Sequence, residues 1–140
     1  RDLHIDNRSL AGNLTGIISQ RLLRRLCPHC RRETPIDAAG AELFTHEELE
    51  PPEKVFAAKG CAECRHVGYF ERIGIFEVVR PDRLIREAIE RGSSEDELRS
   101  LIRSRGTPSL QSDALAKVRD GVTSLDELQA VTWRKLPWEG

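Results

Sequence analysis

The chain has 140 residues, of which 39% are hydrophobic and 32% are charged, and its formal net charge is −1. This balance suits a soluble protein and gives no global reason to expect a nucleic-acid partner. No apolar run approaches the ~20 residues that cross a bilayer, and the opening residues RDLHIDNRSL lack the apolar core of a signal peptide. At this length we expect one domain, or one domain plus a small module. Because the chain does not begin with Met, we expect it to be part of a longer polypeptide.

The first predicted element is a helix in residues 9–18. Apolar residues recur there at helical spacing from Leu10, and Ser9 can serve as the N-cap. The next segment, QRLLRRL at residues 20–26, allows two interpretations. Its leucines could extend the helix, or they could form the inward-facing set of a short strand.

Residues 27–68 are predicted to form a loop-rich module, because prolines and glycines recur along them. A basic segment, QRLLRRLCPHCRR, leads into this module, and an acidic stretch, AELFTHEELEPPE, lies within it. One short helix is expected around residues 46–50 of the acidic stretch. After the module, RIGIFEVV at residues 72–79 is the clearest strand, since it is rich in β-branched and aromatic residues and Pro81 closes it.

Four short helices are predicted in the remainder of the chain, and their ends are well marked. The markers are the C-terminal glycines Gly92, Gly106 and Gly121, and two capping boxes, Ser94 with Glu97 and Ser124 with Glu127. Their loops differ and their apolar positions do not superimpose. A compact helical bundle is therefore favoured over a solenoid repeat.

Every cysteine of the chain lies in a C-x-x-C pair: Cys27, Cys30, Cys61 and Cys64. Such a turn supplies two thiolates from one bend, and two turns complete a tetrahedral metal site. Two disulfides would need an oxidising compartment, and a thioredoxin-like redox pair leaves the other pair unexplained. The pattern therefore predicts a four-cysteine site, with zinc as the redox-inert structural metal. His29 and His66 are interpreted as neighbouring or exposed groups rather than ligands.

The order of motifs is QRL-x-R-x-LC-P-x-C, then GC-x-x-C-x-x-x-GY, then R-x-GI-x-E, then a helix with G-x-T-s-x-x-E. From about Leu10 to Thr132 this order resembles the C-terminal part of the GspE/PilB-type traffic ATPases, the motors of type II secretion and type IV pilus assembly. The resemblance implies that residues 20–26 are a core strand paired with residues 72–79, with the tetracysteine module inserted between them. It also implies that the four cysteines bind zinc. Glu71 stands where the family usually has glycine.

These expectations define an α+β fold: a short two-stranded hairpin from a P-loop ATPase core, an inserted tetracysteine zinc module, and a C-terminal bundle of about four short helices. The expected divisions are the end of the ATPase core at 1–26, the zinc-binding insertion at 27–68, the returning core strand at 69–80, the helical subdomain at 81–132, and a tail with Trp133 and Trp138 at 133–140.

The resemblance implies an intact protein that hydrolyses ATP with Mg²⁺ as a homo-hexamer in the cytoplasm, peripheral to the inner membrane, where it drives a platform protein. The chain itself lacks a G-x-x-x-x-G-K-[ST] phosphate-binding loop. We therefore predict that this part is structural and docking rather than catalytic, with one structural zinc ion. The acidic stretch could meet a basic partner surface, whereas Arg21 and Arg25 are interpreted as charges on the strand surface.

Two alternative functions belong to other classes. The basic segment RRLCPHCRR supports a zinc-ribbon module that binds nucleic acid through phosphate contacts. The neutral overall charge and the scarcity of aromatic residues, which make up 5% of the chain, argue against it. A rubredoxin-like iron electron carrier has a similar pair spacing, but the second pair here reads CAECRH and the aromatic content is low.

Overall fold

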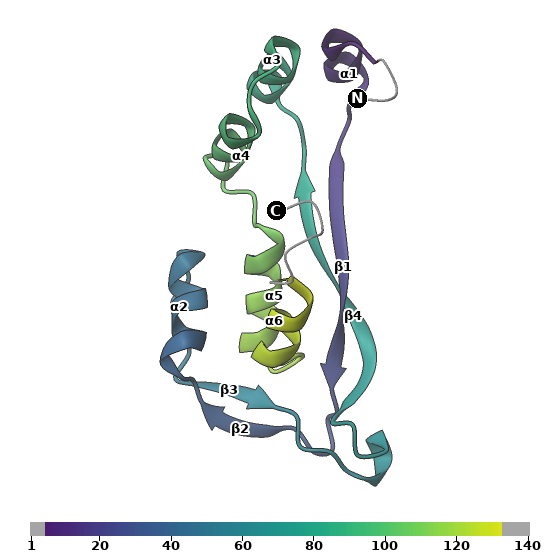
Figure 1. The fold of residues 1–140 in the computed structure, drawn as a ribbon, viewed down its shortest axis with the longest axis vertical. Coiled ribbons are helices and arrows are strands. Elements are labelled where there is room, and N and C mark those ends of the chain that lie inside the picture. The colour runs from purple at the N-terminus through teal and green to yellow at the C-terminus, as the bar shows by residue number, and fades with distance from the viewer. Residues whose placement is uncertain (1–4, 133–140) are drawn as a thin grey trace. The chain divides into compact units, whose positions relative to one another are not determined.

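The computed structural model of the chain describes residues 5–132, so the predicted tail with Trp133 and Trp138 lies outside the described residues. Helices and strands are interspersed along the described part (Figure 1). In chain order they are α1 Asn7–Asn13, β1 Ile17–Leu26, β2 Arg32–Pro35, α2 Ala38–His46, β3 Lys54–Ala57, the 3-10 helix η1 Ala62–Cys64, β4 Tyr69–Val79, α3 Arg83–Arg91, α4 Glu95–Arg103, α5 Leu110–Arg119 and α6 Leu125–Thr132. Within residues 5–132, every helix is too short or too polar to span a membrane.

The chain divides into two compact units. Unit 1 comprises the chain up to Ser19 together with Phe76–Ser109, and unit 2 comprises Gln20–Ile75 together with the chain from Leu110. Both boundaries fall inside β1 and β4, so each of these strands contributes to both units. The predicted α+β class is confirmed, because six helices accompany two small two-stranded sheets in the described residues.

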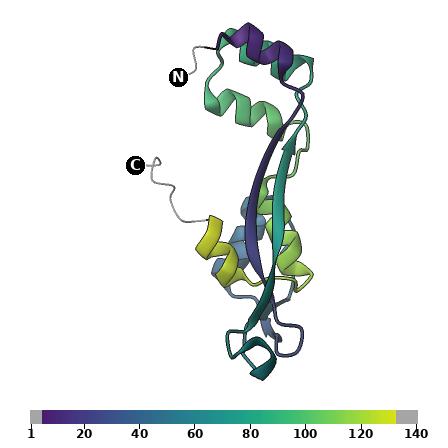
Figure 2. The ribbon, with the colours of Figure 1, turned by 90° about the vertical axis from the view of Figure 1, so that its right-hand side faces the viewer.

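β1 and β4 pair with each other and run in opposite directions (Figures 1 and 2). Of the two interpretations of residues 20–26, the strand is therefore correct. The strand predicted at residues 72–79 is also confirmed, although it begins earlier, at Tyr69. Leu23 and Ile75 are fully buried while their neighbours Leu22 and Phe76 are exposed, which is the alternation expected of strands with one covered face.

The first helix begins and ends earlier than the sequence predicts. α1 ends at Asn13, and Ile17 already belongs to β1. Consecutive β-branched isoleucines restrict side-chain rotamers in a helix and favour a strand, which accounts for the difference. The N-cap is Asp6 rather than Ser9: the Asp6 carboxylate accepts hydrogen bonds from both the backbone N–H and the hydroxyl of Ser9.

Unit 1 contains α1, α3 and α4. The guanidinium of Arg86 in α3 donates to the backbone carbonyl of Ala11 in α1, which joins these two helices. Asp82 caps α3 by accepting from the N–H of Ile85, and it also forms an ion pair with Arg105 at 2.9 Å. Burial here is limited, since α4 has no fully buried residue.

The predicted ends of α3 and α4 are largely confirmed. Gly92 follows α3 with a left-handed backbone, φ 70°, and Ser94 and Glu97 form the predicted capping box of α4. The number of helices after β4 also agrees with the prediction. Of these helices, α3 and α4 belong to unit 1, and α5 and α6 belong to unit 2.

The cysteine-containing region is more regular than the predicted loop-rich module. β2 and β3 form an antiparallel pair with Arg32 opposite Ala57. The helix expected around residues 46–50 is wrong, because α2 lies at Ala38–His46 instead. Its start is set by Asp37, whose carboxylate accepts from the N–H of Gly40 at 2.7 Å.

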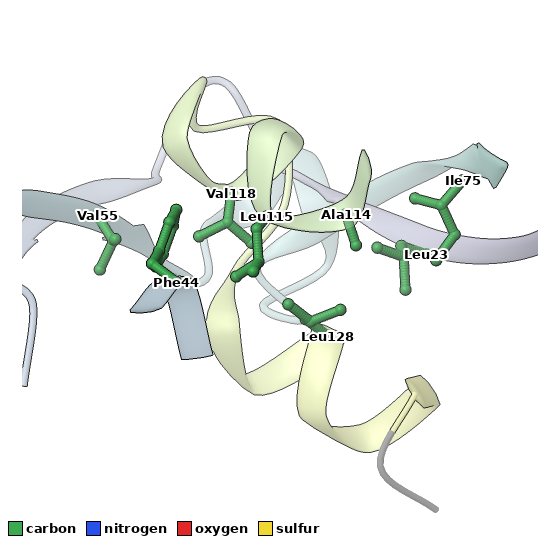
Figure 3. Close-up of a cluster of buried hydrophobic side chains, with 8 residues drawn as sticks. All are labelled: Leu23, Phe44, Val55, Ile75, Ala114, Leu115, Val118 and Leu128. Carbon is green, nitrogen blue, oxygen red and sulfur yellow. The ribbon is translucent and has the colours of Figure 1, made fainter. Parts of the chain in front are cut away.

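The hydrophobic core lies in unit 2 and joins the module to the strands. Side chains of α5 and α6 lie between Leu23 and Ile75 of the β1–β4 pair on one side and Phe44 and Val55 of the module on the other (Figure 3). The buried members are Leu23, Phe44, Val55, Ile75, Ala114, Leu115, Val118 and Leu128. The cysteine-containing module at residues 27–68 thus shares this core with α5 and α6.

Candidate metal centre

The first C-x-x-C pair continues directly from the end of β1. The N–H of Cys27 donates to the carbonyl of Gly68 at 3.0 Å, next to the start of β4. The chain then turns, and the N–H groups of Cys30 and Arg31 donate back to the carbonyl of Cys27 at 3.3 and 3.0 Å. This turn presents two thiols from one bend whose base is fixed to the neighbouring strand.

The second pair occupies a tight turn around η1. The N–H of His66 donates to the carbonyl of Cys61 at 2.8 Å, and the N–H of Val67 donates to that of Cys64 at 3.1 Å. Arg65 and His66 both have left-handed backbones, with φ of 52° and 62°. Left-handed residues of this kind are uncommon, and here they fold the chain back toward β4.

Two glycines allow the second turn to pack against its surroundings. Gly60 has φ 97°, and a Cβ there would lie 2.6 Å from the carbonyl oxygen of His66. Gly68 has φ 81°, and a Cβ there would lie 2.7 Å from the Cβ of Ala58. Both the backbone conformation and the available space therefore require glycine.

The four sulfurs form one compact group. All four Sγ atoms lie within 4.8 Å of one another. The Sγ–Sγ distance is 3.9 Å between Cys27 and Cys61, 3.8 Å between Cys30 and Cys64, and 3.8 Å between Cys61 and Cys64. A tetrahedral ion at about 2.3 Å from each sulfur requires sulfur–sulfur distances of about 3.8 Å. None of the four cysteines is in a disulfide, so their arrangement fits a metal such as zinc.

Backbone amides surround Cys64 in particular. The N–H groups of Cys61 and Gly68 each donate to its Sγ at 3.2 Å. Burial acts to raise the pKa of Cys64, but these amides and the neighbouring thiols of Cys61 and Cys30 together outweigh it and lower the pKa to about 6. At Cys30, burial and the neighbouring sulfurs instead raise the pKa to about 11. A cation at the centre of the four sulfurs would favour ionisation of all of them.

The predicted ligand residues come together, and the two histidines do not join them. The group of nearby ligand atoms in the described residues comprises the four cysteines and includes neither His29 nor His66. Arg25 forms an exposed ion pair with Glu71 at 3.4 Å, and Arg21 donates to the carbonyl of Val131 at 2.7 Å.

Much of the basic segment is engaged inside unit 2. Arg24 forms an ion pair with Glu127, and Arg31 donates to the carbonyl of Gly121. These guanidinium groups already have partners within the chain, which weakens the case for phosphate binding by this segment. The sequence did not predict these contacts, because each joins residues about ninety or more positions apart.

The four thiols thus form one compact group that could hold a metal such as zinc. Residues 1–130 match the family described as Type II/IV secretion system protein, and the chain belongs to this family. This match confirms the resemblance drawn from the motifs.

Several curated relatives agree with the family match. The chain is 42% identical to type II secretion system protein E of Aeromonas hydrophila, 38% to type II secretion system ATPase E of Vibrio cholerae and 33% to type IV pilus assembly ATPase PilB of Thermus thermophilus. Each similarity covers 94% of this chain, but only 26%, 26% and 15% of the respective relative. The chain therefore spans about a quarter or less of these proteins.

Proposed function

We propose that this chain is the C-terminal part of a motor ATPase of type II secretion or type IV pilus assembly, with a structural and docking role. The family match and the ATPase names of relatives support the motor assignment. In this proposal β1 and β4 belong to the P-loop ATPase core, and residues 27–68 are a zinc-binding insertion between them. The intact motor is a cytoplasmic homo-hexamer, peripheral to the inner membrane, that uses ATP and Mg²⁺.

Cys27, Cys30, Cys61 and Cys64 bind one zinc ion that braces this insertion. The observation that carries the proposal is the spacing of the sulfurs: three Sγ–Sγ distances are 3.8–3.9 Å, which matches the edge of a zinc tetrathiolate, and all four atoms lie within 4.8 Å of one another. Such a closed site leaves no open position for substrate, so the metal contributes to folding rather than to a reaction. The hydrogen bond from Cys27 to Gly68 supports this role, because the loop is closed at its base.

Elemental analysis of the reduced chain, purified without added metal, tests this proposal. We expect about one zinc per chain, loss of zinc in Cys30→Ser, and retention of zinc in the matched control His29→Ala. Iron in place of zinc would favour the rubredoxin-like alternative. A metal-free chain that is fully folded, with free thiols or two disulfides, would contradict the proposal.

ATP hydrolysis is assigned to a part of the motor outside this sequence, because the chain carries no phosphate-binding loop. We expect no phosphate release from the 140-residue chain with ATP and Mg²⁺, and ATP hydrolysis by the intact protein. ATPase activity that co-purifies with the 140-residue chain, and that stops when a chelator is added, would contradict this division of roles.

The acidic stretch at residues 41–53 is proposed to dock the inner-membrane platform protein. It carries four exposed carboxylates, from Glu42, Glu48, Glu50 and Glu53. Reversing these charges to lysine in the intact protein should weaken binding to a basic cytoplasmic surface of that partner. The exposed Asp96→Lys is the control in unit 1. Unchanged binding after reversal would rule out this surface.

A further inference from the structure

The turn between α5 and α6, residues 120–124, is fixed to the end of β1. The N–H of Leu26 donates to the carbonyl of Val122 at 2.8 Å, and the hydroxyl of Thr123 donates to the carbonyl of Arg24 at 2.8 Å. Leu26 directly precedes the first cysteine, and Thr123 is fully buried. The turn is therefore held by the backbone that leads into the metal centre.

Arg31 provides the most direct link from the first cysteine pair to this turn. Its Nη1 donates to the carbonyl of Gly121 at 2.5 Å, and its guanidinium lies 4.7 Å from the ring centroid of Phe56. The fit is close, since a Cβ at Gly121 would lie 2.5 Å from a Phe56 ring carbon. Carbonyl groups after a helix carry partial negative charge, so the guanidinium is well suited to this position.

The second cysteine pair reaches the same turn through the start of β4. The hydroxyl of Tyr69 lies 2.7 Å from that of Ser124, within hydrogen-bond distance. The preceding residue, Gly68, donates to the Sγ of Cys64 and accepts from the N–H of Cys27. The first cysteine pair is thus linked to the turn through one residue and one hydrogen bond, and the second pair through two residues and two hydrogen bonds.

We propose that the α5–α6 turn responds to the state of the tetracysteine centre, with Arg31 as the main connecting residue. Ordering of the two cysteine pairs by metal fixes Arg31 and the Gly68–Tyr69 segment, and the turn is stabilised in consequence. This inference rests on the proposed zinc site. Because binding couplings are reciprocal, the turn must in return strengthen metal binding by the same factor.

Hydrogen exchange of the 140-residue chain, followed by mass spectrometry, tests the link with zinc bound. In Arg31→Ala we expect residues 120–124 to exchange about tenfold faster, the size of one hydrogen bond to a charged group. The chain should still hold about one zinc, bound about tenfold more weakly in a chelator competition. The matched control is Arg32→Ala, which removes the same charge one residue later, at the start of β2. It should change neither quantity more than about twofold.

The outcomes separate this inference from the proposed function. If the wild-type chain binds no zinc, the zinc site itself is refuted, and the inference with it. If zinc binds normally but Arg31→Ala and Arg32→Ala behave alike, the inference alone is overturned. Zinc removal from the wild type should also speed hydrogen exchange in residues 120–124, while exchange in α3 and α4 of unit 1 stays unchanged. Equal protection of residues 120–124 before and after zinc removal would contradict the coupling.

Discussion

Glu127 in α6 binds Arg24 in β1 through both carboxylate oxygens. One oxygen accepts from the Arg24 backbone N–H at 2.9 Å, and the other accepts from the guanidinium at 2.8 and 2.6 Å. The Glu127 side chain is only 5% exposed, and the guanidinium of Arg24 stacks over the ring of Tyr69 at 4.1 Å. This part-buried contact joins α6 to β1, the strand that leads into the first cysteine pair.

Removing the charge of Glu127 should destabilise unit 2. We expect Glu127→Gln to lower the free energy of unfolding by about 1–3 kcal/mol, because the amide carries no charge and places an NH2 donor against one of the Arg24 donors. The control is Glu95→Gln, which removes an exposed ion pair with Arg99 and should cost less than about 0.5 kcal/mol. Urea unfolding, followed by circular dichroism, measures the unfolding free energy of both variants. A similar loss of unfolding free energy in the two would contradict the importance of the Glu127–Arg24 contact.

The same contact predicts a pH dependence. Burial acts to raise the pKa of Glu127, but hydrogen bonds from Arg24 outweigh it, so the pKa lies below its ordinary value of 4.5. A lowered pKa in the folded chain stabilises it above the ordinary value, and this stabilisation is lost as pH falls through the folded pKa. The stability difference between wild type and Glu127→Gln should therefore stay constant from about pH 7 to about pH 5 and shrink below that. A difference that stays constant at acid pH would contradict this.

Gly121 and Gly106 form a matched pair for testing the packing of the α5–α6 turn. Both have φ 66°, but a Cβ at Gly121 would lie 2.5 Å from the Phe56 ring, whereas a Cβ at Gly106 meets nothing within 4 Å. Gly106→Ala should cost about 1 kcal/mol, from backbone strain alone. Gly121→Ala should cost at least about 2 kcal/mol, since overpacking adds to the strain. Equal losses in thermal unfolding would show that the turn is not closely packed.

Glu71 adopts a left-handed backbone conformation, with φ 65°, inside β4. A left-handed residue within a strand is typical of a bulge and favours glycine. We expect Glu71→Gly to be more stable than Glu71→Ala by about 1 kcal/mol, which reverses the usual order in strands. Both variants lose the exposed ion pair with Arg25, so chemical unfolding isolates the backbone effect. If Glu71→Ala were more stable than Glu71→Gly, the backbone at residue 71 would not be strained.

Local signals in the sequence predicted the site better than the fold around it. The C-x-x-C spacing identified four residues that do come together, and Gly92 and the Ser94–Glu97 box marked real helix ends. The β2–β3 pair was missed, because its strands have only four residues each and lie in proline-rich sequence. Short strands of this kind have little periodicity to detect.

Long-range contacts account for the other differences. Ser124 accepts from the N–H of Glu127 as the predicted second capping box requires, but the Glu127 carboxylate binds Arg24 in β1. Likewise, the basic segment predicts arginines that are free to bind phosphate, but the guanidinium of Arg31 donates to the backbone carbonyl of Gly121. A pattern within one helix or segment cannot indicate a partner about a hundred residues away.

We propose above all that the four cysteines hold one zinc ion that braces residues 27–68. X-ray absorption at the zinc edge of the purified, reduced chain tests it most directly. We expect four sulfur neighbours of the zinc at about 2.3 Å and no nitrogen neighbours. Zinc bound by a mixture of nitrogen, oxygen and sulfur, as at a site that includes His29 or His66, would contradict it.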